Sequence, residues 1–423
     1  MRPVVLGLVA AWWAGRVLAA EPTFAELNAA LGGKLWQDDS LWDDGAGEVA
    51  GRLGWLPESQ TETLSSYRLY PVGEYRLLGA QVYSAALYAE TGRVTQVSLI
   101  FINKGDYAGV RRQSGMSREM WREWEQERRR RLQGFSSAFR KERDRIESAL
   151  NKALGASARD RFGAAAATSE SVRRWDWAGH SLLLATPNQD YIALRIVPTT
   201  LAEAEGKTTR VRDSKLREQL ARRVERRPNG DVVVTQIPMV DQGAKGYCVP
   251  ATWERYLRYV GITVDMYALA MAGETEAGGG TYLDEMAKSV SGLISRSGRR
   301  LEKIHRSVSI SAVAGYVDRG LPLMWGMHHQ PELDYQISHR SGARRAVTDW
   351  AQWIERLKEA RRAARRYSFD KETSGHMCLI IGYNAATEEL AISDSWGPEF
   401  AERWLTIEEA RHLDQGKFYV ISW

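Results

Sequence analysis

Residues 241–250 of this 423-residue chain are Asp241-Gln242-Gly243-Ala244-Lys245-Gly246-Tyr247-Cys248-Val249-Pro250. The glutamine stands six positions before the cysteine. After Pro250, aromatic and aliphatic side chains recur at helical spacing up to Gly261. Pro250 suits a first helical turn, because its ring fixes a suitable φ angle and the first amides have no partner inside a helix. The pattern predicts a loop that leads into a helix with Cys248 at its start.

A cysteine at a helix start is well placed to form a thiolate. The first amides and the positive end of the helix dipole stabilise an anion, and the thiolate is the nucleophilic form of cysteine. The competing interpretation is that Cys248 packs as a small apolar residue, as buried free cysteines commonly do. Partner residues elsewhere in the chain distinguish the two interpretations.

Two stretches far downstream supply such partners. His376 precedes a short apolar run that ends in a turn at Asn384, and a second apolar run over residues 390–393 leads to Asp394. These runs predict two strands of a hairpin, which would bring the histidine and the acid side by side. The competing interpretations are a core histidine for His376 and an ordinary strand end for Asp394.

These residues, in this order, resemble the pattern of the papain-like cysteine peptidase superfamily. In that pattern a glutamine precedes the cysteine by six residues, and a histidine at a strand start and then an asparagine or aspartate follow. Gln242, Cys248 and His376 match it, and Asp394-Ser395-Trp396-Gly397 matches the family's Asn-Ser-Trp-Gly with its first residue changed. The resemblance covers residues 235–423. It implies an α+β peptidase domain with a helical half that carries the cysteine and an antiparallel β half that carries the histidine and the acid.

The chain departs from papain itself around the nucleophile. Lys245 and Val249 stand where papain has an additional structural cysteine and an aromatic residue. The third member is an acid, and no papain-type prosegment is recognisable. These departures make the region more similar to the bacterial double-glycine leader peptidases, the C39-like peptidases, and their secreted relatives.

The resemblance implies a role for each residue. Cys248 would attack a carbonyl carbon as a thiolate, and His376 would take the thiol proton and later deliver it to the leaving amine. Asp394 would orient the imidazole and stabilise its charged form. Gln242 and the backbone amide of Cys248 would bind the developing oxyanion. Trp396 would shield the histidine and the acid from water, although ordinary core packing explains a tryptophan equally well.

Cys378 is the second of the two cysteines, and it has the same side-chain parity as His376 on the predicted strand. We expect it to pack in the core. The alternative is a disulfide with Cys248, which an oxidising compartment permits and which would abolish activity.

The first 20 residues predict an exported protein. Arg2 precedes an apolar run over residues 4–14, and small residues at positions 19–20 suit cleavage of a signal peptide. Arg16 keeps the apolar run well below the roughly 20 residues of a membrane span. We therefore expect removal of residues 1–20, no stable membrane anchor, and a periplasmic or extracellular location.

The composition is that of a globular protein with two domains. The chain exceeds one ordinary core in length, with 44% hydrophobic and 26% charged residues. The net charge is only +5, and the arginine runs alternate with acidic residues on predicted helices. Such alternation is typical of solvated faces, so we expect no nucleic acid partner.

Residues 21–200 predict an α+β accessory domain. Early tryptophans suggest a short helical start, residues 67–102 alternate as about three strands, and residues 117–154 carry an apolar helical stripe that Gly134 divides. Strands return over residues 172–177, 181–186 and 191–197. Antiparallel sheet with covering helix is the expected architecture.

Residues 201–234 are rich in Lys, Arg and Glu and predict one exposed helical linker that ends at Pro228. Proteases cut exposed basic linkers, so one hypothesis is that residues 21–200 are a prodomain released near residues 222–227. The alternative is a permanent accessory domain.

Three glycines at residues 278–280 precede Thr281, which we expect to cap a helix over residues 282–290. The alternative, a self-processing site at these glycines, would split the peptidase domain. A further helix over residues 347–366 is expected to form one wall of the substrate groove.

Three histidines, His328, His329 and His339, lie between these segments. No cysteine or acidic residue stands at metal-ligand spacing from them, so we expect loop histidines near the groove and neither a metal nor another cofactor.

Together these residues predict a secreted cysteine peptidase that acts on a peptide or protein substrate. Two alternatives stay open. One is an amidase or transglutaminase-like acyl transferase with the same Cys-His-Asp order, and the other is a catalytically inactive relative that binds peptides.

Overall fold

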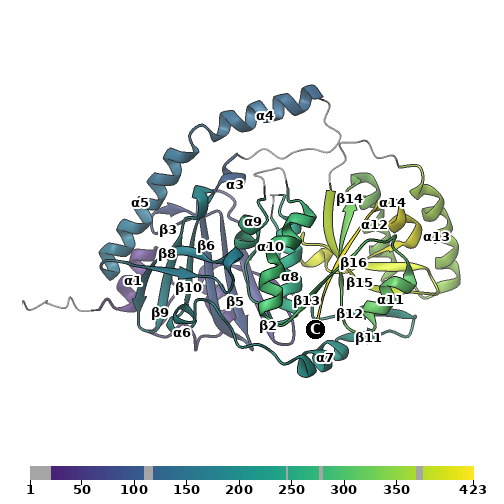
Figure 1. Cartoon of the computed structure of the whole chain (residues 1–423), viewed down its shortest axis with the longest axis horizontal. Coiled ribbons are helices and arrows are strands. Elements are labelled where there is room, and N and C mark those ends of the chain that lie inside the picture. Colours follow the sequence, from purple (N-terminus) through teal and green to yellow (C-terminus); the bar gives the residue numbers. More distant parts are fainter. Residues whose placement is uncertain (1–20, 109–117, 244–245, 276–279, 368–374) are drawn as a thin grey trace, which may run out of the picture.

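The computed structural model describes residues 21–108, 118–243, 246–275, 280–367 and 375–423. Within them, two large antiparallel sheets lie on opposite sides of a group of helices (Figure 1). The first sheet comes from residues 56–198 and the second from residues 224–422. The expected signal peptide over residues 1–20 lies outside the described residues.

The first sheet has eight described strands in the order β1-β2-β5-β6-β10-β9-β8-β7. Its strands are β1 (Leu56–Gln60), β2 (Leu64–Leu69), β5 (Ser84–Glu90), β6 (Arg93–Asn103), β7 (Ala158–Phe162), β8 (Glu170–Trp177), β9 (His180–Ala185) and β10 (Tyr191–Pro198). A separate small hairpin is formed by β3 (Arg76–Leu77) and β4 (Ala80–Gln81). The prediction of three strands between residues 172 and 197 is confirmed.

Helices cover one face of this sheet. The helices of the N-terminal region are α1 (Phe24–Leu31), α2 (Ala46–Leu53), α3 (Lys104–Ala108), α4 (Arg118–Leu132), α5 (Phe135–Leu154) and α6 (Thr199–Glu203). Helix α5 buries Phe139, Ile146 and Leu150 in one core with α1, α2 and the sheet. Gly134 separates α4 from α5, as the sequence predicted.

The other face of the first sheet packs against the second half of the chain. Side chains alternate along a strand, so Leu194 of β10 joins the core beneath α5, whereas Tyr191 and Ala193 point the opposite way. These two residues form a separate apolar cluster with Tyr247 and Met266. The two halves of the chain therefore share a buried apolar contact.

The second sheet also has eight described strands, with the main order β11-β12-β15-β14-β18-β13 and with β16 between β15 and β17. Its strands are β11 (Val224–Arg226), β12 (Asp231–Val234), β13 (Arg300–Ile304), β14 (Leu323–His328), β15 (Gly375–Asn384), β16 (Glu389–Ser393), β17 (Arg403–Thr406) and β18 (Asp414–Ser422). The pairings between neighbouring strands are antiparallel.

The helices associated with this sheet are α8 (Cys248–Tyr259), α9 (Met266–Ala272), α10 (Leu283–Arg296), α11 (Ile310–Val317), α12 (Pro331–Arg344), α13 (Trp350–Ala364) and α14 (Ile407–Leu413). Figure 1 shows α8, α9 and α10 between the two sheets. Helices that cover antiparallel sheets thus give the α+β architecture that the sequence predicted. In the part of the chain that the structure describes, no helix is both long and apolar enough to span a bilayer.

Residues 201–234 do not form the single exposed helix that we predicted. They contain α7 (Asp213–Arg222) and the hairpin of β11 and β12, whose turn includes Gly230 at φ +89°. The Pro-Asn-Gly sequence is therefore a hairpin turn and not a helix end. Strand β12 is fully buried and pairs with β15. The charged composition of the segment hid this short apolar strand.

The expected cap at Thr281 is also wrong. Helix α10 begins at Leu283 with Tyr282 as its N-cap, and no side chain caps it. The Thr281 hydroxyl lies 2.7 Å from the Thr275 hydroxyl instead. Residues 278–279, part of the alternative processing site, lie outside the described residues. The helix expected over residues 347–366 is present as α13.

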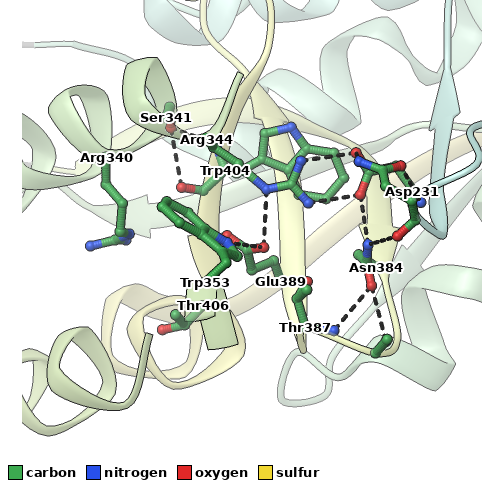
Figure 2. A network of polar contacts seen from close by, with 12 residues as sticks. Asp231, Arg340, Ser341, Arg344, Trp353, Asn384, Thr387, Glu389, Trp404 and Thr406 are labelled. Atoms are coloured by element: carbon green, nitrogen blue, oxygen red, sulfur yellow. Dashed lines mark hydrogen bonds and ion pairs between the residues drawn. The ribbon is translucent and has the colours of Figure 1, made fainter. Parts of the chain in front are cut away.

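A buried polar network fastens α12 to the second sheet (Figure 2). Arg344, near the end of α12, donates from both terminal nitrogens to Asp231 of β12 at 2.9 and 2.7 Å, and from Nε to Glu389 of β16 at 3.0 Å. Its guanidinium also lies 3.7 Å from the ring centroid of Trp404 on β17. One buried cation therefore joins three strands to a helix.

Replacing this cation should destabilise the fold strongly. Arg344→Ala removes the buried cation from two buried carboxylates, and removing one member of a buried ion pair typically costs about 3–5 kcal/mol. Urea unfolding measures the loss. The exposed neighbour Arg345 provides the control, because Arg345→Ala should change stability by no more than about 0.5 kcal/mol. Equal effects of the two substitutions would contradict the role assigned to Arg344.

Candidate active site

Cys248 is the first residue of helix α8, as the sequence predicted. The apolar face of α8 holds the helix in the core, where Trp253, Tyr256 and Leu257 have no exposed surface. Pro250 lies in the first turn. The thiol is half-buried at the positive end of a well-anchored helix, which favours its anionic form.

His376 and Asp394 lie side by side at the ends of two paired strands. Strands β15 and β16 run antiparallel with Leu379 opposite Ser393, so the start of β15 lies next to the end of β16. The Nε2 atom of His376 is 2.7 Å from Oδ1 of Asp394. The hairpin predicted from the sequence therefore brings the histidine and the acid together. Because Asp394 occupies Nε2, Nδ1 is the ring nitrogen that can form a hydrogen bond with the Cys248 thiol.

The thiol and the imidazole stabilise each other's charges. Burial opposes ionisation of Cys248, but a hydrogen bond to His376 and the charge of that ring lower the pKa of the thiol below its usual value. Burial likewise opposes the charge on His376, yet Asp394 and Cys248 raise the pKa of its imidazole to about 10. Each charge thus favours the other, so the contact promotes a thiolate and imidazolium pair.

Aromatic rings enclose the imidazole. Trp396 stacks on His376 with ring centroids 4.6 Å apart and an angle of 27°, and Phe400 meets Trp396 edge-on at 5.5 Å. His329, just after β14, lies 6.1 Å from the ring of His376 and 5.8 Å from that of Trp396. Burial and the charge of His376 lower the pKa of His329. His329 is therefore a neighbour of the candidate pair.

The other two histidines lie on a strand and on a helix. His328 is the last residue of β14, and His339 lies on α12, where its ring stacks on Tyr335. Among the residues that the structure describes, no group of three or more His, Cys, Asp and Glu side chains is arranged to hold a metal ion.

Sequence reasoning missed Arg403, the second partner of Asp394. From β17, Arg403 donates to Oδ2 of Asp394 with Nε at 3.1 Å and Nη2 at 2.5 Å. Its remaining nitrogen donates to Asp334 at 2.9 Å and to Ser338 at 2.7 Å, both on α12. An arginine directly before the apolar pair Trp404-Leu405 was the signal that could have revealed it.

This arginine explains how a carboxylate persists in the core. Asp394 has no exposed surface, and burial alone would favour its neutral form. The charge of Arg403, together with the hydrogen bond and charge of His376, lowers the pKa of Asp394 to about 2. The acid is consequently ionised at every pH at which the protein is expected to work.

Gln242 is tied to the residue after the acid. Its backbone amide donates to the Ser395 carbonyl at 2.8 Å, and its side-chain oxygen accepts from the Ser395 hydroxyl at 2.8 Å. Because the oxygen of the amide is engaged in this way, the amide nitrogen is the atom suited to donate to an oxyanion. The glutamine, the histidine and the acid therefore belong to one connected site.

Arg255 lies about two turns along α8 from Cys248. Its hydrogen bonds hold α8 against the segments that carry the other site residues. It is 1% exposed, and it donates from Nε to the Pro238 carbonyl at 2.9 Å. Its terminal nitrogens donate to the carbonyl and hydroxyl of Ser393 at 3.1 and 2.5 Å. The helix of Cys248 is thereby fastened both to the segment before Gln242 and to the strand before Asp394.

Cys378 packs in the core, as expected, and both cysteines are free thiols. Its sulfur lies 3.7 Å from the sulfur of Met327 on the neighbouring strand. Burial raises the pKa of this thiol well above its usual value, so Cys378 stays protonated. The alternative disulfide between Cys248 and Cys378 is not formed.

One family model matches the C-terminal part of the chain. Residues 234–420 match the family model described as Peptidase_C39 like family. This part of the chain is therefore similar to the C39-like peptidases, in agreement with the resemblance that the sequence pattern predicted.

Among solved structures, a match is the peptidase domain of Streptococcus ComA, titled as a bifunctional ABC transporter involved in a quorum-sensing pathway. The identity is 12%, the TM-score is 0.28, and the match covers 44% of this chain and 96% of that chain. No curated protein matches the chain.

The lowered pKa of Cys248 predicts its reactivity towards an alkylating agent. The alkylation rate should rise with pH through a midpoint below the usual thiol value of about 8.5, because the thiolate is the reacting form. In His376→Ala the stabilising charge is lost while the burial stays, so the midpoint should move upward. Mass spectrometry after timed treatment with iodoacetamide measures both rates, with the buried Cys378 as an internal reference. An unchanged midpoint in His376→Ala would disprove the pairing.

Arg403→Gln should destabilise the protein more at pH 7 than at pH 3. Without the cation the pKa of folded Asp394 rises, so between about 2 and that higher value the variant binds protons that the wild type does not. By linkage, the stability difference between the two proteins grows as the pH rises through this interval, to about 3–5 kcal/mol at pH 7. Urea unfolding at both pH values measures the difference. Arg403→Lys, which keeps the charge, should lose less, and a difference independent of pH would contradict the prediction.

Proposed function

We propose that this protein is a cysteine peptidase in which Cys248, His376 and Asp394 form the catalytic triad and Gln242 completes the oxyanion site. The observation that carries the proposal is the hydrogen-bonded sequence from the Cys248 thiol through His376 to a buried, ionised Asp394. The C39-like family of residues 234–420 supports the same conclusion.

In the proposed first step, the Cys248 thiolate attacks the carbonyl carbon of a substrate peptide bond. The carbonyl oxygen becomes an oxyanion, which the Gln242 amide and the backbone amide of Cys248 bind. His376 then donates a proton from Nδ1 to the leaving amine, and an acyl enzyme remains on the sulfur.

In the second step, neutral His376 accepts a proton from a water molecule, and the resulting hydroxide attacks the thioester. Collapse of the tetrahedral intermediate releases the acid product and restores the thiolate and imidazolium. Throughout, Asp394 holds Nε2 of the ring, so that Nδ1 stays directed at the thiol. Stacked Trp396 keeps water away from the bond between the histidine and the acid, which strengthens it.

We also propose that the enzyme works outside the cytoplasm. The apolar run that begins at residue 4, with small residues at positions 19–20, supports removal of a signal peptide during export. N-terminal sequencing of protein recovered from the producing cell tests this, since the proposal requires a mature chain that begins near residue 20 or 21.

Activity and labelling of matched variants test the proposed peptidase. The chain that begins at residue 21 should release peptides from casein, and mass spectrometry should detect them. Cys248→Ala and His376→Ala should lower the rate by at least about 10³-fold, because members of a triad act as one unit. Cys378→Ala, which changes the other cysteine, is the control and should keep the activity. A peptidyl epoxide should label wild type and the control alone.

Other outcomes would replace the proposal. Incorporation of a free amine into casein without peptide release would indicate an acyl transferase. Absence of both hydrolysis and epoxide labelling, with peptide binding retained, would indicate an inactive relative.

A further inference from the structure

The segment that leads to Gln242 lies along the edge of the first sheet. Strand β1 is the edge strand there, and residues 236–241 follow it in the opposite direction. Two hydrogen bonds join the segment to β1, from Met239 N to Ser59 Oγ at 2.9 Å and from Asp241 N to Glu58 Oε1 at 2.7 Å. A third, from Glu62 N to Gln236 Oε1 at 2.5 Å, lies just beyond the end of β1. In a regular β-strand, backbone carbonyls would accept these hydrogen bonds. Here side-chain oxygens accept them instead.

Glu58 occupies a special position on β1. The register between β1 and β2 shifts there, which marks Glu58 as the extra residue of a β-bulge. Its side chain is buried, and Arg68 and Ser66 of β2 donate to it at 2.5 and 2.8 Å. Bulges redirect side chains, and this one directs a firmly held carboxylate at the amide of Asp241.

Tyr70 contacts the residues on both sides of Gln242. Its hydroxyl donates to the Asp241 carbonyl at 2.6 Å. Its ring lies against Gly243, which has φ +67° and where a Cβ would come within 2.8 Å of the ring. Only glycine suits such a contact. The N-terminal domain therefore holds the glutamine by its two neighbours.

The other end of the loop is held in the same way. Tyr247, the residue before Cys248, packs against Tyr191 and Ala193 of the first sheet. Asn103, at the end of β6, donates to the Tyr247 hydroxyl at 3.2 Å. Both ends of the loop that connects Gln242 with Cys248 thus contact the N-terminal domain.

The segment over residues 236–242 also contacts the peptidase domain, on the side that faces away from the first sheet. Arg255 donates to the Pro238 carbonyl, and Gln242 donates its backbone amide to Ser395. Without the N-terminal domain, the segment would lose its hydrogen bonds to Ser59, Glu58 and Tyr70. The backbone amides of Met239 and Asp241 and the carbonyl of Asp241 would then be left without these partners, and an unmade backbone hydrogen bond in a buried setting is costly. The segment would then be held on one side only.

We infer that residues 21–200 are a permanent part of the enzyme and that Glu58 and Tyr70 are positioning residues for the oxyanion glutamine. They act through the backbone of Asp241 and Gly243, and this inference rests on the proposed role of Gln242. The domain is accordingly no removable prodomain. A cut between residues 222 and 227 would also fall in or beside β11, which belongs to the peptidase sheet.

Tyr70→Phe tests the positioning, because it removes one hydroxyl and keeps the ring against Gly243. A loosened oxyanion donor should lower kcat by about 10- to 100-fold with little change in KM. A peptide aldehyde, whose adduct carries an oxygen in the oxyanion position, should bind more weakly by a similar factor. Alkylation of Cys248 by iodoacetamide, which forms no oxyanion, should keep its rate.

The matched control is Tyr67→Phe, on the preceding strand, whose ring packs in the core of the N-terminal domain. It should leave all three measurements unchanged. Equal kcat and aldehyde affinity in Tyr70→Phe, Tyr67→Phe and wild type would overturn the inference.

Hydrogen exchange separates this inference from the proposed function. If wild type hydrolyses no peptide, the proposed function fails, and the positioning is read from the exchange of residues 236–243. Faster exchange there in Tyr70→Phe than in Tyr67→Phe supports the contact, and equal exchange overturns it.

A cut between the two domains tests whether residues 21–200 are a permanent part of the enzyme. Residues 207–210 are exposed and lie outside helices and strands, so a specific protease site placed there gives a nicked chain. The two pieces should stay together at full activity, and separating them in denaturant should abolish activity until they are recombined. Higher activity of the separated peptidase piece would overturn the inference in favour of a prodomain.

Discussion

Asp394 carries a negative charge where water cannot reach it, and the surrounding structure satisfies that constraint. A buried carboxylate without partners is costly by several kcal/mol, so both of its oxygens need cationic or donor groups. His376 contacts one oxygen and Arg403 the other. These contacts require β15, β16 and β17 to pair in one register. A slip of one residue would turn each side chain to the opposite face of the sheet.

The requirement extends outward through further buried charges. Arg403 needs Asp334 and Ser338 on α12, and α12 is itself held to the sheet by Arg344 (Figure 2). Arg344 in turn neutralises Asp231 on β12. Two charge clusters near opposite ends of α12 therefore connect this helix with the hairpin after α7 and with the candidate catalytic residues. Together with the pairing of β12 and β15, these contacts make the segment predicted as a linker a part of the second sheet.

Local patterns predicted much of the fold, and they failed where a residue's role depends on distant partners. The break at Gly134, the strands between residues 172 and 197 and the position of Cys248 at a helix start follow from side-chain periodicity and from a glycine or proline nearby. Strand β12 was missed because four buried residues are too short a run beside so much charge. Its assignment depends on pairing with β15, which lies far along the chain.

The candidate site divides in the same way. The types and order of Gln242, Cys248, His376 and Asp394 were enough to indicate thiol chemistry, because each residue type has its own reactivity and the spacing matches a known pattern. The local sequence around these four residues does not show which acid Arg403 contacts or that the carboxylate of Glu58 holds the amide before the glutamine. Glu58 and Asp241 are 183 positions apart, and such contacts arise only when the two sheets pack around the helix of Cys248. Chemical identity is a property of single residues, whereas ionisation and orientation depend on the groups that folding places around them.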